Sequence, residues 1–174
     1  MRADHFASLV EDNPNKFNVN DVEINRFPDY TDLVTALKTK LNTKDLWQAA
    51  IFEHNPDLRD ENLILVAPTG VGKTEFAYLW GAGRKNIFAL PMRAAVNGVW
   101  NRTRELWGQI PHCSNEEVAL LHGDASLELY QHTDLDLEGE IRPAIDMARQ
   151  LSQPYIDCTA DQIAPADLRY PGYE

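Results

Sequence analysis

Residue types that mark secreted, membrane-spanning or metal-clustered proteins are scarce in this chain. Two cysteines occur among 174 residues, Cys113 and Cys158, and they lie far apart, in no spacing typical of a zinc site. No apolar run approaches the ~20 residues that span a bilayer, and the first residues lack the apolar stretch of a signal peptide. We therefore expect a protein of the reducing cytoplasm, with buried free thiols and no association with a membrane.

Positive charge is scarce as well. Lysine and arginine total 16 against 27 aspartates and glutamates, which gives a net charge of −11. A chain with this balance is not held to nucleic acid by its overall field, so any contact with DNA has to be local. Much of the acid lies outside the motifs described below, at Glu116, Glu117, Asp134, Asp136, Glu138 and Glu140.

Composition indicates an ordinary globular protein of one domain. Hydrophobic residues make up 44% of the chain and charged residues 25%, and the length suits a single domain with a real core. Residues 1–30 contain repeated asparagine and proline breaks, so we predict a tail or linker there. The domain itself is predicted over residues 31–174.

Short apolar runs alternate with segments of helical periodicity along that domain. Strands are predicted over 63–67, 86–90, 118–121 and 155–159. Helices are predicted over 31–41, 44–53, 74–80, 94–107 and 141–151, the first of them capped by Thr31 or Asp32. The earliest strand, LILVA, is a continuous apolar run of the kind buried on both faces. Strands that alternate with helices predict an α/β fold with a parallel sheet flanked by helices.

The stretch LVAPTGVGKTEF, residues 65–76, is typical of a phosphate-binding loop. Gly72, Lys73 and Thr74 match the end of the Walker pattern, whereas Ala67 stands where its first glycine belongs. The stretch follows an apolar run and opens a helical segment, as a phosphate loop does. The alternative is a glycine-rich turn that ends in a solvated lysine.

The chemistry of this loop requires these residue types. Gly70 and Gly72 let backbone N–H groups turn toward phosphate oxygens, and the start of the next helix adds partial positive charge. Lys73 is predicted to reach the β- and γ-phosphates of a nucleoside triphosphate, and the Thr74 hydroxyl to bind Mg²⁺. The predicted phosphate cradle consists of Thr69, Gly70, Val71, Gly72, Lys73 and Thr74.

Two further positions are candidates for ligand contacts. Gln48, upstream of the loop, carries an amide that can pair with N6 and N7 of adenine; the alternative is a surface glutamine on a helix. Arg93 follows the strand predicted over 86–90, at the sheet edge where ligands of parallel sheets bind. With Ala94 at the start of the next helix, Arg93 can grip a nucleic-acid phosphate, or it is a solvated surface arginine.

Polar residues also follow the two remaining strands. LLHGDA ends the third predicted strand with His122, a residue type that is more often structural than functional when it stands alone. CTADQIA ends the fourth with Thr159, Asp161 and Gln162, which are candidates for ligand contacts. The alternative is that Thr159 or Asp161 caps a helix.

Taken in order, these stretches resemble the first motor domain of superfamily 2 helicases. More narrowly, they resemble the helicase-nuclease of type I CRISPR interference systems. The resemblance runs over roughly residues 30–174, through TGVGKT, LPMRAAVNGVW, LLHGDA, CTADQ and RYPGYE. The alanine at the first Walker position is usual in that superfamily, whereas Met92 replaces the usual threonine of the motif around Arg93, which puts a hydroxyl contact to DNA in doubt.

The resemblance implies a P-loop NTPase fold, here an incomplete first RecA-like helicase domain. It implies an ATP-dependent helicase of antiviral defence that uses ATP and Mg²⁺. Such an enzyme is recruited by a guide-RNA surveillance complex, translocates on single-stranded DNA and degrades the target with an HD nuclease domain. In that setting Gln48 would read adenine, and residues 69–74 would hold the phosphates and Mg²⁺. The single-strand path would be lined by Arg93, Ala94, Thr159, Asp161 and Gln162.

The ends of the sequence carry two further expectations. ADHFAS, residues 3–8, resembles the last signature of the HD nuclease domain, which would make Asp4 a transition-metal ligand if that domain is complete; the alternative is an ordinary tail. No Asp-Glu-x-His motif follows the loop in residues 75–174, so we expect this chain to bind ATP without appreciable turnover, and to show an open sheet edge with exposed apolar surface. The rival functions are a nucleotide-binding interaction module and a small-molecule P-loop kinase.

Overall fold

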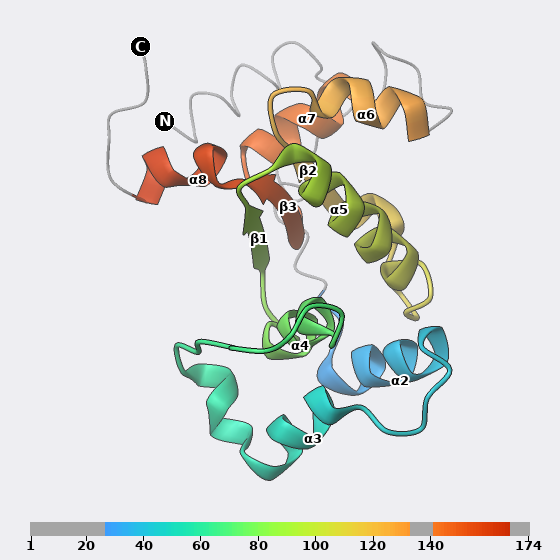
Figure 1. The fold of residues 1–174 in the computed structure, drawn as a ribbon. Coiled ribbons are helices and arrows are strands. Elements are labelled where there is room, and N and C mark those ends of the chain that lie inside the picture. Colours follow the sequence, from blue (N-terminus) through green and yellow to red (C-terminus); the bar gives the residue numbers. More distant parts are fainter. Residues whose placement is uncertain (1–26, 133–140, 168–174) are drawn as a thin grey trace.

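A computed structural model describes residues 27–132 and 141–167 of the chain (Figure 1). The predicted metal ligand Asp4 and most of the predicted tail lie outside these residues. No helix in the two described ranges is both long and apolar enough to cross a membrane. Cys158 is buried and Cys113 half-buried, and neither forms a disulfide within the described residues.

The centre of the fold is a parallel sheet of three strands, in the order β1-β3-β2. The strands are β1 (Asn86–Leu90), β2 (Val118–Leu121) and β3 (Tyr155–Thr159). Asn86 and Val118 both pair with Tyr155, so the three strands start level and end at the same edge. The α/β class and the parallel sheet predicted from the sequence are confirmed, with the predicted bounds for these three strands.

Helices surround the sheet and form a second group at one end of it (Figure 1). Those that pack on the sheet are α5 (Arg93–Trp107), α6 (Ala125–His132), α7 (Arg142–Arg149) and α8 (Ala160–Asp167). Those of the second group are α2 (Tyr30–Lys40), α3 (Trp47–His54), the 3-10 helix η2 (Pro56–Asp60) and α4 (Lys73–Trp80). A short 3-10 helix, η3 (Asn115–Glu117), precedes β2.

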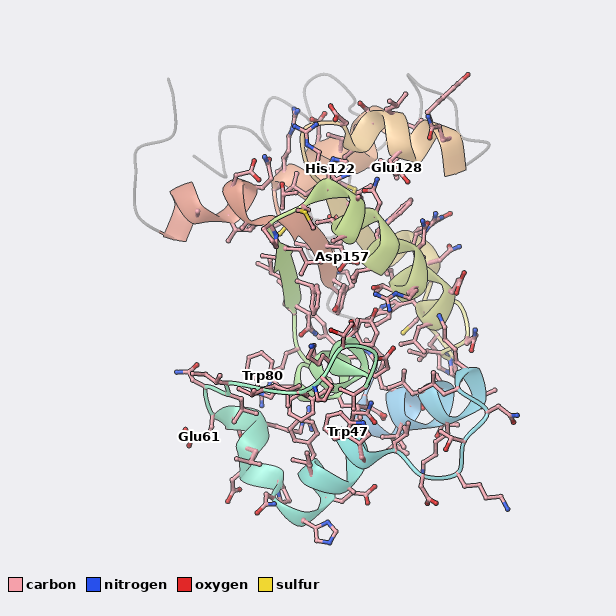
Figure 2. The ribbon with its side chains drawn as sticks, viewed as in Figure 1. Trp47, Glu61, Trp80, His122, Glu128 and Asp157 are labelled. Carbon is pink, nitrogen blue, oxygen red and sulfur yellow. The ribbon has the colours of Figure 1, made fainter. Side chains whose placement is uncertain are left out.

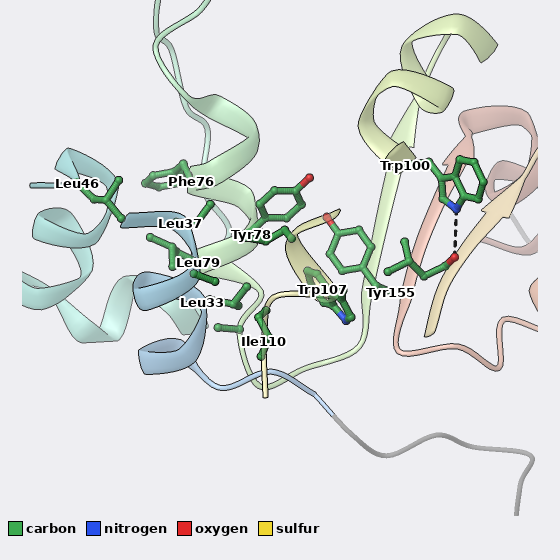
Figure 3. Close-up of a cluster of buried hydrophobic side chains, with 14 of the residues drawn as sticks. Leu33, Leu37, Leu46, Phe76, Tyr78, Leu79, Trp100, Trp107, Ile110 and Tyr155 are labelled. Carbon is green, nitrogen blue, oxygen red and sulfur yellow. Dashed lines mark hydrogen bonds between the residues drawn. The ribbon is translucent and has the colours of Figure 1, made fainter. Parts of the chain in front are cut away.

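The two faces of β3 contribute to two different cores, because successive side chains of a strand point to opposite faces. Tyr155 joins the large core that α5 shares with the second helical group (Figure 3). Ile156 and Cys158 join a smaller core against α7. In the large core the Trp107 and Tyr155 rings lie 4.8 Å apart, and the Tyr78 and Tyr155 rings 5.7 Å apart.

The predicted apolar side of α5 is the side that the structure buries. Its members, spaced three and four residues apart, are Val96, Val99, Trp100, Thr103, Leu106 and Trp107. Trp100 also donates a hydrogen bond from its indole nitrogen to the carbonyl of Val118, at 3.1 Å, which ties the helix to the start of β2. The helix therefore contributes a large buried hydrophobic surface to the stability of the fold, and the Trp100 hydrogen bond fixes its position along the sheet.

The predicted strand over 63–67 is wrong. The segment carries no regular secondary structure, and Ile64 and Val66 expose 94% and 91% of their surface, while Leu63 and Leu65 are half-buried. The side chains alternate as they would in a strand, but no other described strand runs beside the segment, and a strand forms only with a backbone partner.

Helix starts in the second group also differ from the prediction. The residue that caps α2 is Asp29, whose side chain accepts a hydrogen bond from the backbone of Asp32 at 2.8 Å. Helix α3 starts at Trp47 because Thr43 exchanges hydrogen bonds with the backbone of Asp45. This local turn competes with the first helical turn that we predicted from residue 44.

Candidate functional site

The predicted phosphate loop is a turn of alternating backbone handedness that leads directly into α4. Gly70 and Gly72 have φ angles of 83° and 95°, a region that side-chain-bearing residues rarely adopt. At Gly72 a Cβ atom would lie 2.2 Å from the side-chain nitrogen of Gln48, so a side chain here would displace that amide in addition to straining the backbone. Helix α4 then begins at Lys73, and its first turn closes when Phe76 N–H donates to the Gly72 carbonyl at 3.1 Å.

Helix α3 holds the loop through two consecutive side chains. The indole nitrogen of Trp47 donates to the carbonyl of Val71 at 2.8 Å, and the amide nitrogen of Gln48 donates to the carbonyl of Gly72 at 3.1 Å. The Trp47 ring also stacks on Phe76, with 5.9 Å between centroids and 15° between planes. The loop is thereby attached to a neighbouring helix as well as to the helix that it opens.

A pocket of about 490 Å³ lies beside the loop. It is lined by residues 69–75, by residues 45–48 at the start of α3, and by Leu41, Thr43 and Arg102. Gln48 is 3% exposed, and its side-chain oxygen is buried without a hydrogen-bond partner among the described residues. A ligand with an N–H donor, such as the amino group of adenine, would satisfy this acceptor.

Lys73 folds back over the loop. Its ammonium group donates to the carbonyls of Ala67 and Pro68, at 3.0 and 3.3 Å. Because Lys73 is exposed, phosphate oxygens placed in the loop would compete with these carbonyls for its protons. Thr74, half-buried in the first turn of α4, lines the same pocket.

The loop also fits a magnesium ion that arrives with a nucleotide. Within the described residues, no group of three or more His, Cys, Asp or Glu side chains could hold a metal ion. Mg²⁺ commonly keeps several waters and binds through one or two protein oxygens together with substrate phosphates. The Thr74 hydroxyl is suited to that arrangement, because it needs no preformed cage.

A second group of polar residues gathers where the three strands end. We call Arg93, Asn97, His122, Asp124, Glu128 and Asp161 the strand-exit cluster. The guanidinium of Arg93 pairs with the carboxylate of Asp124, and both side chains are 59% exposed. A Cβ atom on Gly123 would lie 3.5 Å from the Arg93 guanidinium, so the arginine passes close to the loop after β2.

His122 is the buried member of the cluster and its hydrogen bonds define its protonation. Its Nδ1 accepts from the backbone N–H of Asp124 at 3.1 Å, so the ring proton lies on Nε2, which is 2.7 Å from the side-chain oxygen of Asn97. Asn97 in turn donates to Glu128 at 2.6 Å. Burial lowers the pKa of His122, while the charge of Asp124 acts in the opposite direction. The imidazole is therefore neutral at physiological pH.

The residues predicted after β3 divide between buried and exposed positions. Thr159 is 3% exposed, whereas Asp161 and Gln162 are exposed in the first turn of α8. The Thr159 hydroxyl, and then the Gln162 amide, hold the pKa of Asp161 below its ordinary value. Thr159 immediately precedes α8, and Asp161 lies in its first turn. Ala94, in the first turn of α5, is exposed.

Sequence reasoning missed the roles of Trp47, Asn97 and Glu128. Asn97 lies one turn after Arg93 on α5, which is a local signal that helical spacing could have supplied. Glu128 lies on α6, a helix that we did not predict, and it reaches Asn97 only through the fold.

The loop and the strand-exit cluster lie at opposite ends of the molecule. Figure 2 shows Trp47, which contacts the loop, far from His122 and Glu128. Helix α5 connects the two ends, since Arg93 begins it and Arg102 lines the pocket beside the loop. Arg102 lies nine positions after Arg93 on α5, a rise of about 13 Å along the helix.

A buried carboxyl group lies between the two ends. Asp157, on β3, is 0% exposed, and both of its oxygens lack a hydrogen-bond partner among the described residues. Burial raises its pKa well above the ordinary range, although the nearby Thr103 hydroxyl and Arg102 charge act in the opposite direction. The raised pKa favours the protonated, uncharged form, which avoids the cost of a buried, unpaired charge.

Comparison with known proteins finds two relatives that are similar to part of the chain. It is 37% identical over 114 residues to the CRISPR-associated nuclease/helicase Cas3 of Methanothermobacter thermautotrophicus, across 64% of this chain and 13% of that protein. It is 27% identical over 95 residues to the putative CRISPR-associated nuclease/helicase Cas3 of Methanocaldococcus jannaschii, across 51% of this chain and 12% of that protein. No protein-family model and no solved structure matches the chain. The resemblance seen in the motifs is confirmed: the chain is similar to CRISPR-associated nuclease/helicases, and it spans only about an eighth of the length of these relatives.

Proposed function

We propose that this chain binds ATP with Mg²⁺ at residues 69–74 and forms part of the motor of a helicase-nuclease. The observation that carries the proposal is the loop itself: Gly70 and Gly72 adopt positive φ angles immediately before α4, in a chain related to proteins named nuclease/helicases. Backbone N–H groups at a helix start are a general anion-binding arrangement. Residues 31–174 would then belong to the first RecA-like domain.

Each loop residue has a distinct proposed role. Lys73 exchanges its two carbonyl partners for phosphate oxygens, and Thr74 contributes its hydroxyl to Mg²⁺. Gln48 receives the amino group of adenine on its unpaired oxygen, while its nitrogen stays on the Gly72 carbonyl. Mg²⁺, when bound, neutralises charge on the phosphates.

The strand ends are the proposed contact for single-stranded DNA. The path would be formed by Arg93, Ala94, Thr159, Asp161 and Gln162, which follow β1 and β3 at the edge where parallel strands place ligands. Since Arg93 already pairs with Asp124, the contact would be weak and local in this acidic chain. The HD nuclease domain, its metal ligand Asp4 and recruitment by a guide-RNA surveillance complex are proposals for the full-length protein.

We expect the 174-residue chain to bind the nucleotide without turning it over. Phosphoryl transfer needs a second acid that holds Mg²⁺ and a positioned water, and residues 75–174 contain no Asp-Glu-x-His motif. Measurable ATP hydrolysis that is stimulated by single-stranded DNA and abolished by Lys73→Ala would contradict this part of the proposal.

Titration of the chain with a fluorescent ATP analogue and Mg²⁺ tests the binding site. Lys73→Ala should weaken binding at least about tenfold, because it removes a charge-assisted contact to phosphate. Lys85→Ala removes the same charge from an exposed position outside the pocket and should leave binding unchanged. Absent binding, or an equal loss in both variants, would refute the proposed site.

A further inference from the structure

The orientation of the phosphate loop depends on a residue outside the loop. We propose that Trp47 is a positioning residue, whose indole N–H turns one peptide unit of the loop so that its amide faces the phosphates. The proposal rests on the nucleotide binding proposed above. It assigns Trp47 no contact with phosphate; its effect passes through the Val71 carbonyl.

The argument starts from the geometry of the peptide bond. In a planar trans peptide the C=O of one residue and the N–H of the next point in opposite directions. The Val71 carbonyl accepts from Trp47 at 2.8 Å. The N–H of Gly72 must therefore point away from Trp47, and we place the phosphate oxygens on that side of the peptide unit.

Gln48 acts on the next peptide unit in the same way. Its nitrogen holds the Gly72 carbonyl at 3.1 Å, which directs the N–H of Lys73 away from α3. That carbonyl also accepts from Phe76 N–H at 3.1 Å, within the first turn of α4. The helix thus supports the second peptide unit independently of Gln48, whereas Trp47 supports the first from outside the loop and its helix.

The position of Trp47 is itself well defined. Its ring stacks on Phe76, whose ring lies 4.8 Å from that of buried Phe52. This stack joins α3 to the first turn of α4, so the indole nitrogen sits on a rigid support. A positioning group is effective when its own rotamer is fixed by packing.

Trp47→Phe separates the hydrogen bond from the stack, because phenylalanine keeps a ring against Phe76 but has no N–H. We expect affinity for Mg²⁺-pyrophosphate, Mg²⁺-ATP and Mg²⁺-GTP to fall by a similar factor, about 5- to 10-fold, as for the loss of one hydrogen bond. The loss should not depend on the base, because the affected group faces phosphate.

Trp80→Phe is the matched control. Trp80 lies on α4 and is 37% exposed, against 36% for Trp47, but it does not line the pocket. This variant should bind all three ligands as the wild type does, and both variants should unfold at similar urea concentrations. Unchanged affinity in Trp47→Phe would overturn the proposal. A loss for the nucleotides but not for pyrophosphate would also overturn it, and would indicate stacking of Trp47 on the base.

Hydrogen exchange of the free chain gives a second test that needs no ligand. Amides of residues 70–73 should exchange faster in Trp47→Phe than in Trp80→Phe, since the first peptide unit is no longer held. If the wild type binds neither pyrophosphate nor nucleotide, the proposed function fails, and faster exchange still supports the positioning role. Equal exchange in the two variants would overturn it.

Discussion

The phosphate loop and the strand-exit cluster present polar groups in opposite ways. At the loop, side chains of α3 bind the carbonyl groups of Val71 and Gly72, which turns the following backbone N–H groups away from those side chains. At the strand ends, side chains bind one another: Arg93 pairs with Asp124, and His122 with Asn97. The loop is therefore prepared to receive an anion, whereas the cluster must exchange an internal partner for any ligand.

The loop and the strand-exit cluster also differ in the charged groups that surround them. Backbone amides carry no net charge and their direction is fixed by the fold, so their capacity to bind an anion does not depend on a side-chain ion pair. The cluster holds one arginine among the carboxylates of Asp124, Glu128 and Asp161. The comparison teaches that the proposed anion site of the loop is built from its own backbone, whereas the proposed contact with DNA at Arg93 would need further positive charge.

Packing beneath the loop should produce the largest effect. Phe76→Ala removes a 7% exposed ring that stacks on Trp47 and packs at a tilt against Phe52, and should reduce the free energy of unfolding by about 3–5 kcal/mol. Tyr130→Ala, at a 53% exposed position of α6 at the other end, should change it by less than about 0.5 kcal/mol. Urea unfolding measures both; comparable losses would remove the contrast.

The buried acid between the two ends should make stability fall as pH rises. The pKa of Asp157 is raised in the folded state, so above the ordinary value of 3.8 the folded chain retains a proton that the unfolded chain has released. Stability is then lost with increasing pH, by up to about 1.4 kcal/mol per pH unit for one proton.

Asp157→Asn should remove that slope, because asparagine mimics the protonated acid at every pH. Asp161→Asn, at an exposed position, should keep it. The measurement is urea unfolding from pH 5 to pH 8. A wild type whose stability rises across this range by more than that of the Asp157→Asn variant would disprove the assignment of the buried proton.

The strand-exit cluster should show a weaker dependence of opposite sign. The pKa of His122 is lowered below its ordinary 6.5 by burial, so the unfolded chain binds a proton first as pH falls. The stabilising contribution is complete above pH 6.5 and is lost below it, as protonation breaks the bond from Asp124 N–H to Nδ1. His122→Gln should flatten the dependence of the melting temperature on pH between 7 and 5, whereas His54→Gln, at an exposed site, should not.

The exposed ion pair should have the smallest effect. Asp124→Asn removes the partner of Arg93, but both side chains are 59% exposed, so stability should change by about 0–1 kcal/mol. Any change should shrink in high salt, which screens exposed charges. Asp60→Asn, which breaks the exposed pair with Arg84, is the comparison. A large, salt-independent loss for Asp124→Asn alone would show that the cluster is structurally rigid.

Sequence patterns predicted the strands and the buried helix face that short-range spacing determines. The three observed strands and the buried side of α5 follow from short apolar runs and from helical spacing. The run over 63–67 is apolar like the three strands. Its sequence does not reveal whether a neighbouring strand exists, and the described residues supply none. Hydrophobicity predicted the tendency to form a strand, whereas pairing decided the outcome.

The candidate sites also contain some features that the sequence predicts and others that it does not. The loop was predictable because glycine, lysine and threonine occur at the spacing that is typical of phosphate-binding loops. The attachment of Trp47 to Val71 and of Asn97 to Glu128 was not, because each pair meets only after the helices have packed. Partners of this kind become visible only in three dimensions.

Helix α5 adds a thermodynamic consequence. It is one rigid element of 15 residues with Arg93 at its start and Arg102 on the wall of the pocket. A ligand that tilts the helix at one end must displace the arginine at the other, because a packed helix moves as a rod. If nucleotide changes the affinity of the Arg93 end for DNA by some factor, DNA must change the affinity for nucleotide by the same factor. The helix that packs in the core would then also couple ligand binding at one end of the molecule to ligand binding at the other.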